Sequence, residues 1–130
     1  MNDSLTSANP DIGTTIPYYV EDYPSVALTT STGLVFVKKT DILYCLAENS
    51  YTNVYLKGGR KVTVSKHLKK VEQALPSNTF VRIHDSHLIN LQHLVRYVND
   101  NHSCVLMSNG EELSVSRNKR KEFLQRFVKI

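Results

Sequence analysis

The chain has 130 residues, of which 41% are hydrophobic and 22% charged, a composition typical of one folded domain. Its longest strictly apolar stretch is six residues, far short of a membrane span, and its first 25 residues contain no Lys or Arg, which argues against a secretory signal. These features exclude a disordered or membrane-embedded protein and predict a cytoplasmic location. Cys45 and Cys104 lie in apolar segments without a CxxC motif, so we expect buried free thiols.

The net charge of +4 is unevenly distributed along the chain. Residues 1–25 carry four acidic side chains and no basic ones, whereas the remainder holds 16 basic and 8 acidic side chains. The first 25 residues are rich in polar residues and Pro and lack periodicity, which predicts a flexible or partly ordered tail or linker. Residues 26–130 are the predicted domain, and its positive excess favours a polyanionic partner such as nucleic acid.

Short strands separated by turns are expected throughout this domain. Gly58-Gly59 and Asn109-Gly110 are typical of tight hairpins, and the apolar run 42–47 indicates a strand covered on both faces. The expected strands are residues 26–30, 34–37, 42–47, 51–56, 61–64, 103–107 and 112–115.

Two short helices are expected between the strands. The first follows Ser65, its predicted N-cap, and ends before Pro76; the second follows Ser116 and carries Phe123 on its apolar stripe. A further helical turn is expected at residues 88–91. The predicted fold class is therefore mainly β, built from antiparallel hairpins with two small α-helices.

Basic side chains gather in two segments. Residues 57–71 hold six positive charges and no acid, and residues 117–129 hold six that are opposed only by Glu122. Either cluster alone is typical of a solvated surface, but the two together favour phosphate binding. The predicted phosphate contacts are Lys57, Lys66, Lys69 and Lys121.

The segment His84-Asp85-Ser86-His87 carries the most reactive side chains. No third and fourth ligand at metal-site spacing accompanies the histidines, and no glycine elbow exposes Ser86 as a nucleophile. A polar binding loop is the favoured interpretation; a turn held by its own hydrogen bonds and a metal-dependent hydrolase using His84, Asp85 and His87 are the alternatives. A phosphate-binding glycine motif is also missing from the sequence. We therefore predict a protein that is not an enzyme, with no catalytic residue, metal or cofactor.

Three tyrosines raise a further alternative, because aromatic side chains on a basic sheet can stack on RNA bases. The spacing of Tyr44 and Tyr55 is more typical of core and hairpin packing. Tyr51 is the exception, since it follows the polar pair Asn49-Ser50. RNA binding by a basic β domain is therefore the second hypothesis.

Four segments follow one another in a distinctive order. They are Asp41-Ile42-Leu43-Tyr44, Glu48-Asn49-Ser50-Tyr51, Phe80-Val81-Arg82-Ile83-His84-Asp85-Ser86-His87-Leu88-Ile89-Asn90-Leu91 and Leu113-Ser114-Val115-Ser116-Arg117. In combination they resemble the LytTR family of bacterial DNA-binding domains over about residues 30–127. The resemblance implies an elongated sandwich of short β-strands. It also implies a transcription regulator whose loops, in place of a helix-turn-helix, enter successive major grooves of duplex DNA.

Carried over position by position, the resemblance implies three contact loops. Arg117 is the leading candidate for a base contact, because a guanidinium donates two parallel hydrogen bonds to guanine O6 and N7. Ser116 is expected to cap the helix that follows. Asp85 and His87 depart from the usual family residues, and a carboxylate at position 85 would accept from cytosine N4. The implied contacts are Asn49, Ser50 and Tyr51 in the first loop, His84, Asp85 and His87 in the second, and Arg117, Asn118 and Lys119 in the third.

The resemblance also implies partners. These are duplex DNA with repeated promoter sites and a second copy of the chain on that DNA, with no membrane involved. Relatives often carry the receiver domain of a two-component system ahead of this module, and about 25 residues are too few for one. We expect either a fragment of a larger regulator, with a receiver or sensor partner, or a stand-alone regulator controlled in another way.

Overall fold

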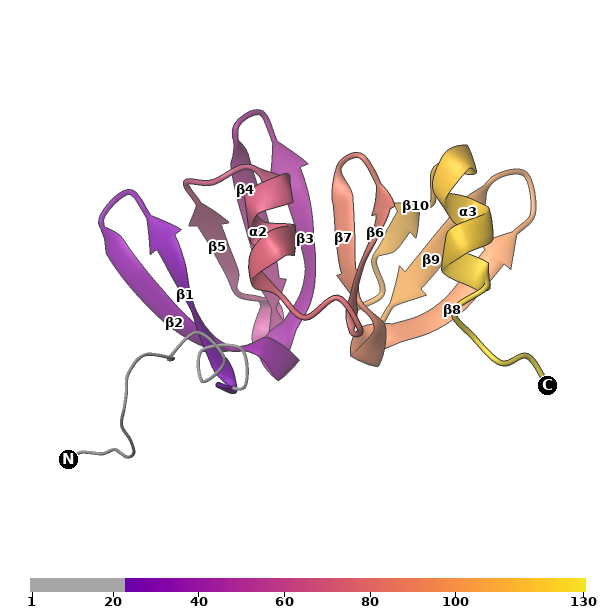
Figure 1. Cartoon of the computed structure of the whole chain (residues 1–130), viewed down its shortest axis with the longest axis horizontal. Helices are drawn as coiled ribbons and strands as arrows, with labels where there is room; N and C mark the ends of the chain where they lie inside the picture. The colour runs from indigo at the N-terminus through magenta and orange to yellow at the C-terminus, as the bar shows by residue number, and fades with distance from the viewer. Residues whose placement is uncertain (1–22) are drawn as a thin grey trace, which may run out of the picture.

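The computed structural model describes residues 23–130, which Figure 1 shows as two groups of strands side by side, each with one helix. This part of the chain contains ten strands and two α-helices. Their bounds are β1 Ser25–Thr30, β2 Gly33–Lys38, β3 Ile42–Glu48, β4 Tyr51–Leu56, β5 Lys61–Val64, α2 Leu68–Ala74, β6 Phe80–His84, β7 His87–Asn90, β8 Leu94–Asn99, β9 Ser103–Met107, β10 Glu112–Ser114 and α3 Arg117–Leu124. Single 3-10 turns occupy Lys39–Asp41, Lys57–Gly59 and Leu91–His93. The tail predicted for residues 1–25 lies, up to residue 22, outside the described residues.

The strands pair in three sheets. The central sheet has the order β5-β4-β3-β7-β6, a β1–β2 hairpin forms the second sheet, and the third has the order β10-β9-β8. Every pairing within residues 23–130 is antiparallel. The prediction of a mainly β fold, elongated and built from hairpins with two small helices, is confirmed (Figure 1).

Two hydrophobic cores share the central sheet. The first lies between the β1–β2 hairpin, β3–β5 and α2; the second lies between β3, β6, β7, the third sheet and α3. In β7, Leu88 belongs to the first core and Ile89 to the second, and both are fully buried. In β3, Ile42 and Cys45 contribute to the first core and Tyr44 to the second, so the prediction of a strand covered on both faces is confirmed. Adjacent strand residues point to opposite faces, which is how one strand serves two cores.

The prediction of a helical turn at residues 88–91 is wrong. Residues 87–90 form strand β7, which pairs with β3 and β6. The short apolar run has the same appearance in a strand and in a helix, and burial on two opposite faces selects the strand.

The predicted N-cap of the first helix is also wrong, because α2 begins after His67 instead of Ser65. The Ser65 N–H donates to the Thr29 carbonyl oxygen at 2.8 Å, which holds Ser65 beside β1. Strands β6 and β8 were not predicted from the sequence. In β8, the consecutive exposed residues Val95 and Arg96 interrupt the alternation at a register shift in the β8–β9 pairing.

The two glycine-containing hairpins are confirmed. Gly58, Gly59 and Gly110 have φ angles of 80°, 79° and 90°, a region that residues with a Cβ rarely adopt. Cys45 and Cys104 are buried and free, as expected. Within residues 23–130, neither helix is long and apolar enough to cross a membrane.

Candidate nucleic-acid interface

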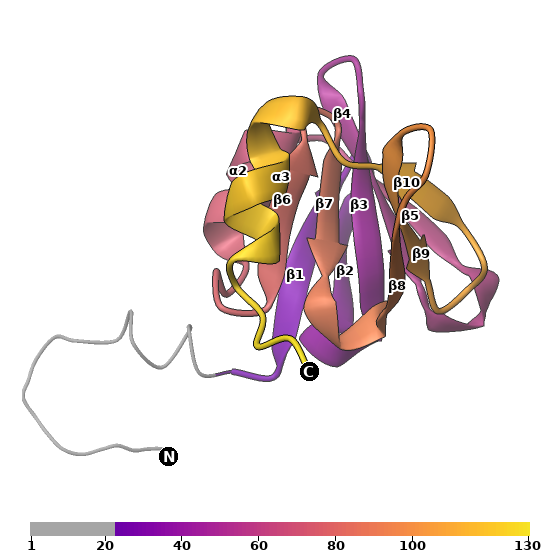
Figure 2. The ribbon, with the colours of Figure 1, turned by 90° about the vertical axis from the view of Figure 1, so that its right-hand side faces the viewer.

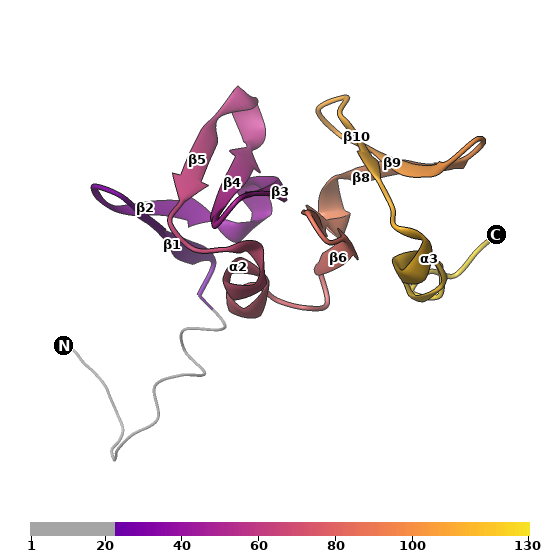
Figure 3. The ribbon, with the colours of Figure 1, turned by 90° about the horizontal axis from the view of Figure 1, so that it is seen from above.

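Three connections between elements lie along one edge of the molecule. They are the β3–β4 turn (residues 49–50), the β6–β7 turn (residues 85–86) and the β10–α3 junction (residues 115–116). Figures 1 and 2 place all three at the upper edge, and Figure 3 looks down onto it. We call this edge the turn edge. It brings together the three loops that the family resemblance implied as contact loops.

The first loop is a tight turn. Glu48 pairs with Tyr51, which leaves Asn49 and Ser50 to reverse the chain. Asn49 has a φ angle of 56°, in the left-handed region that Asn tolerates better than most residues. All three predicted contact residues are exposed, including half of the Tyr51 surface. Asn49 therefore has a backbone role in the turn in addition to any contact that its amide makes.

The second loop is held by its histidines. The Ser86 N–H donates to His84 Nδ1 at 3.0 Å, and His87 Nδ1 donates to the Ser114 carbonyl oxygen at 2.9 Å. The two imidazole rings stack with their centroids 4.3 Å apart. Burial lowers the pKa of His87, the Ser114 carbonyl opposes this shift, and the nearby His84 lowers the pKa further. The turn thus does hold itself by hydrogen bonds, while Asp85 remains exposed to a ligand.

Arg82 stabilises the second loop by hydrogen bonds to its backbone. It was not identified as a site residue from the sequence. Its Nε donates to the His84 carbonyl oxygen at 3.0 Å and its Nη2 to the Asp85 carbonyl oxygen at 2.6 Å. Its Nη1 lies 2.7 Å from Glu72 Oε1 of α2. Arg82 therefore ties the β6–β7 turn to α2. The family-like segment contains this arginine, but only the fold reveals its partners.

The third loop leads from β10 into α3. The Ser116 N–H donates to the Ile83 carbonyl oxygen at 2.8 Å, which fixes the start of the helix beside β6. Ser116 occupies the N-cap position, but its Oγ donates to Asn118 Oδ1 at 2.8 Å and makes no capping hydrogen bond, so that expectation is wrong. Arg117 and Asn118 are exposed and Lys119 is partly exposed. Because no side chain caps the first turn of α3, its backbone N–H groups are available to donate hydrogen bonds to an anion.

Hydrogen bonds also join the three loops to one another. The Ala47 N–H, at the end of β3, donates to the Ser86 carbonyl oxygen at 2.9 Å. The bonds from His87 to β10 and from Ser116 to β6, described above, join the second loop to the third. The turn edge is therefore one connected surface built from both halves of the molecule.

Three of the four predicted phosphate-binding lysines are exposed on elements that reach this edge. Thr52 Oγ1 donates to the Lys66 carbonyl oxygen at 2.8 Å, which places Lys66 beside the first loop. Lys69 lies in the first turn of α2, and Lys121 lies one turn into α3; both are exposed.

Lys57 is separated from this group. It follows β4 in the connection to β5, at the opposite edge from the β3–β4 turn (Figure 1). Its Nζ lies 4.0 Å from Asp41 Oδ1. Arg120, in the basic segment of α3, is turned inward, and its guanidinium donates to Ser103 Oγ at 3.1 Å. Sequence proximity to other lysines therefore does not place a charge on the turn edge.

The alternatives to DNA binding are not favoured, although Tyr51 is exposed. Tyr44 is 2% exposed, stacks on Tyr55 at a centroid distance of 4.9 Å, and accepts a hydrogen bond from Asn109 Nδ2 at 2.9 Å. Burial raises its pKa, and its ring is covered, so it offers no platform for an RNA base. In the part of the chain described, no three His, Cys, Asp or Glu side chains gather as metal ligands, as a metal-dependent hydrolase would need.

Comparison with known proteins agrees with this geometry. The family model of the LytTr DNA-binding domain matches residues 32–127. The chain therefore belongs to the LytTR family of DNA-binding domains, and the resemblance inferred from the sequence is confirmed.

Two relatives illustrate the match. The sensory transduction protein LytT of Bacillus subtilis (strain 168) is 30% identical over 100 residues, which are 75% of this chain and 41% of that protein. This chain thus spans less than half the length of that relative. A LytTr DNA-binding domain from Bacillus cereus has a similar structure, with a TM-score of 0.70 and 26% identity, over 80% of this chain and 96% of that one.

Proposed function

We propose that this chain binds duplex DNA sequence-specifically through its turn edge and acts as a transcription regulator. The observation that carries the proposal is the meeting of three exposed, hydrogen-bonded loops on one edge of a domain that belongs to a DNA-binding family. In this proposal the loops contact bases in successive major grooves, and the scaffold beneath them sets their spacing.

Each loop has a distinct proposed role. Arg117 donates two parallel hydrogen bonds to a guanine. The uncapped N–H groups of α3 and the side chains of Asn118 and Lys119 donate hydrogen bonds to the adjacent phosphates. In the second loop, His84 and His87 contact the backbone or base edges, and Asp85 accepts from a cytosine amine. Asn49, Ser50 and Tyr51 make the contacts of the first loop.

The proposed phosphate contacts are Lys66, Lys69 and Lys121. Lys57 is left out because it lies at the opposite edge, beside Asp41. The proposal contains no catalytic step, and it assigns the protein no metal or cofactor.

The first test selects bound sequences from a random duplex pool and then measures affinity for the selected site and for a scrambled site. Arg117→Ala is expected to lower affinity for the selected site by about 5-fold to 150-fold, the value of one bidentate base contact, and to lower affinity for the scrambled site much less. Arg60→Ala, an exposed arginine at the opposite edge, is the matched control and should change neither affinity. An equal loss of affinity on both sequences would make Arg117 a phosphate contact and contradict its proposed reading role.

We further propose that two copies bind a repeated promoter site, in the cytoplasm, under the control of a receiver domain or sensor partner. The support is the similarity to part of a sensory transduction protein. Mass measurement of complexes on DNA with one and with two copies of the selected site tests the stoichiometry. One bound copy on the two-site DNA at saturation would contradict paired binding.

A further inference from the structure

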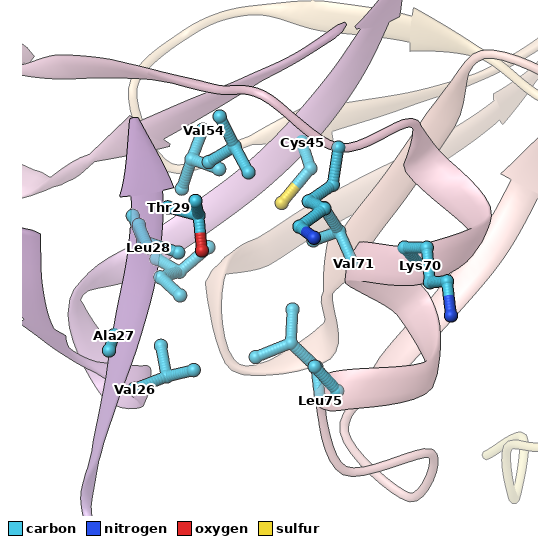
Figure 4. Close-up of a pocket in the computed structure, with 13 residues that line it drawn as sticks. Val26, Ala27, Leu28, Thr29, Cys45, Val54, Lys70, Val71 and Leu75 are labelled. Atoms are coloured by element: carbon cyan, nitrogen blue, oxygen red, sulfur yellow. The ribbon is translucent and has the colours of Figure 1, made fainter. Parts of the chain in front are cut away.

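An apolar cavity lies inside the first half of the molecule. It has a volume of about 190 Å³ and lies between β1, the central sheet and α2 (Figure 4). The apolar side chains around it include Val26, Leu28, Cys45, Val54, Val71 and Leu75.

One lysine supplies charge to this apolar lining. Lys66 lines the cavity and is exposed, so its side chain is at the mouth, whereas the nitrogen of Lys70 points away from the cavity (Figure 4). Lys66 forms no ion pair within residues 23–130. An apolar cavity of about 150 Å³ is large enough for benzene, so about 190 Å³ suits an apolar group of roughly six to eight carbon atoms. The charge at the mouth selects a molecule with one negative group.

We propose that this cavity binds a small amphipathic carboxylate, with its hydrocarbon part inside and its carboxylate beside Lys66. Burying the hydrocarbon supplies the binding free energy, and the lysine selects an anion over a neutral molecule of the same length. The thiol of Cys45, in the cavity wall, contributes as an apolar surface, because burial raises its pKa to about 12.

The cavity is joined to the first loop of the turn edge. The carbonyl oxygen of Lys66 accepts a hydrogen bond from Thr52, the residue after Tyr51. Lys66 is also a proposed phosphate contact, so a carboxylate at the mouth competes with DNA phosphate for this lysine. The bound carboxylate therefore weakens DNA binding, an effect that rests on the proposed function.

Binding is tested on the full chain by calorimetric titration with octanoate and with 1-octanol. We expect octanoate to bind at one site, about threefold to fivefold more tightly than 1-octanol, as suits a partly exposed charge contact. Lys66→Glu should remove this preference. Lys69→Glu, the same change at an exposed lysine outside the cavity lining, should retain it. No saturable octanoate binding, equal affinity for the two probes, or an equal effect of the two substitutions would overturn the site.

A second variant tests the position of the hydrocarbon. Val71→Phe places a ring in the cavity and should reduce octanoate affinity by at least tenfold, and unchanged affinity would overturn the site. Thermal unfolding establishes whether this variant folds, and if it does not, the probe comparison and the lysine pair still decide. Amide shifts in NMR spectra should change along β1 and α2 on octanoate binding. Changes confined to the third sheet and α3 would contradict the placement.

The coupling is tested by titrating the selected DNA at increasing octanoate concentration. DNA affinity should fall by about fivefold at saturation, and saturating DNA should lower octanoate affinity by the same factor, since coupling is reciprocal. Octanoate binding without any change in DNA affinity would support the binding site but overturn its regulatory role. Absence of DNA binding from the start would refute the proposed function, while the calorimetric comparison would still decide the site.

Discussion

The guanidinium of Arg82 donates hydrogen bonds to two successive carbonyl oxygens and to a carboxylate, and these partners come from the β6–β7 turn and from α2. Backbone carbonyl groups near a turn lack strand partners, so a planar group with several donors is well suited to satisfy them together. Arg82 therefore positions His84 and Asp85 without being a proposed contact itself.

Replacing Arg82 with Met should lower the free energy of unfolding by about 1–3 kcal/mol, because two carbonyl oxygens lose their donor. It should also weaken DNA binding, since the second loop loses its support. Arg82→Lys should restore little of the lost stability or DNA affinity, because one ammonium group cannot replace the several planar donors of a guanidinium. Urea denaturation measures the stability. Arg96→Met, at an exposed arginine of β8, is the control, and a loss equal to that of Arg82→Met would contradict the positioning role.

His87 makes stability depend on pH in a defined direction. Its pKa is lowered in the folded protein, mainly by burial, from the ordinary value of 6.5. The unfolded chain therefore binds more protons than the folded one just below pH 6.5, and the free energy of unfolding falls as the pH drops through that region. His87→Gln should flatten this dependence between pH 7.5 and pH 5.5, as measured by urea denaturation at a series of pH values. Parallel curves for the two proteins would show that His87 is not responsible.

In the β3–β4 hairpin, a single residue, Asn49, both forms the turn and is a proposed DNA contact. Asn49 adopts a left-handed conformation, which costs most residues roughly 1–2 kcal/mol and glycine almost nothing. The hairpin therefore accepts Gly at this position, while DNA recognition requires the amide if Asn49 is a contact.

Two substitutions separate these roles. Asn49→Gly should leave the free energy of unfolding nearly unchanged and lower affinity for the selected DNA. Asn49→Val should lower the free energy of unfolding by about 1–2 kcal/mol, because a β-branched side chain disfavours the left-handed region. Thermal unfolding and DNA titration of both variants provide the comparison. Full DNA affinity in Asn49→Gly would assign Asn49 to the turn alone.

The molecule as a whole is built around a central sheet that both cores share. The two halves meet in β3 and β7. Ala47 of β3 donates a hydrogen bond to the β6–β7 turn, and His87 of β7 donates one to β10. Close-packed interiors resist small displacements, so the spacing between the loops is set by the two cores together. This construction suits a surface that must match successive grooves of a stiff double helix.

The salt dependence of DNA affinity tests which lysines of the domain contact phosphate. The slope of log affinity against log salt concentration should become about one unit shallower in Lys66→Gln, because one phosphate contact is lost, and the loss should be similar on all sequences. Lys57→Gln should leave the slope unchanged, since Lys57 lies at the opposite edge. Filter binding at several salt concentrations measures both. An equal change in the two variants would return Lys57 to the contact surface and contradict the assignment.

The amino-acid sequence by itself determined most of the strands, both helices and the two hairpins with glycine pairs or Asn-Gly turns. Asn109-Gly110 and Gly58-Gly59 specify turns within a few residues, and the alternation beside them specifies strands, so these signals act locally. The ordered segments from Asp41 to Arg117 were also enough to indicate the family. The same local logic failed at residues 88–91, where an apolar pair is ambiguous until its two burial faces are known.

Only the tertiary structure decided which distant residues meet. It placed the three loops on one edge, turned Arg120 inward, separated Lys57 from Lys66, and gave Arg82 its partners in α2 and the β6–β7 turn. It also formed the cavity between β1 and α2. The physical reason is that these relations depend on how separate strands and helices pack across two cores. Neighbouring residues alone carry no information on such packing.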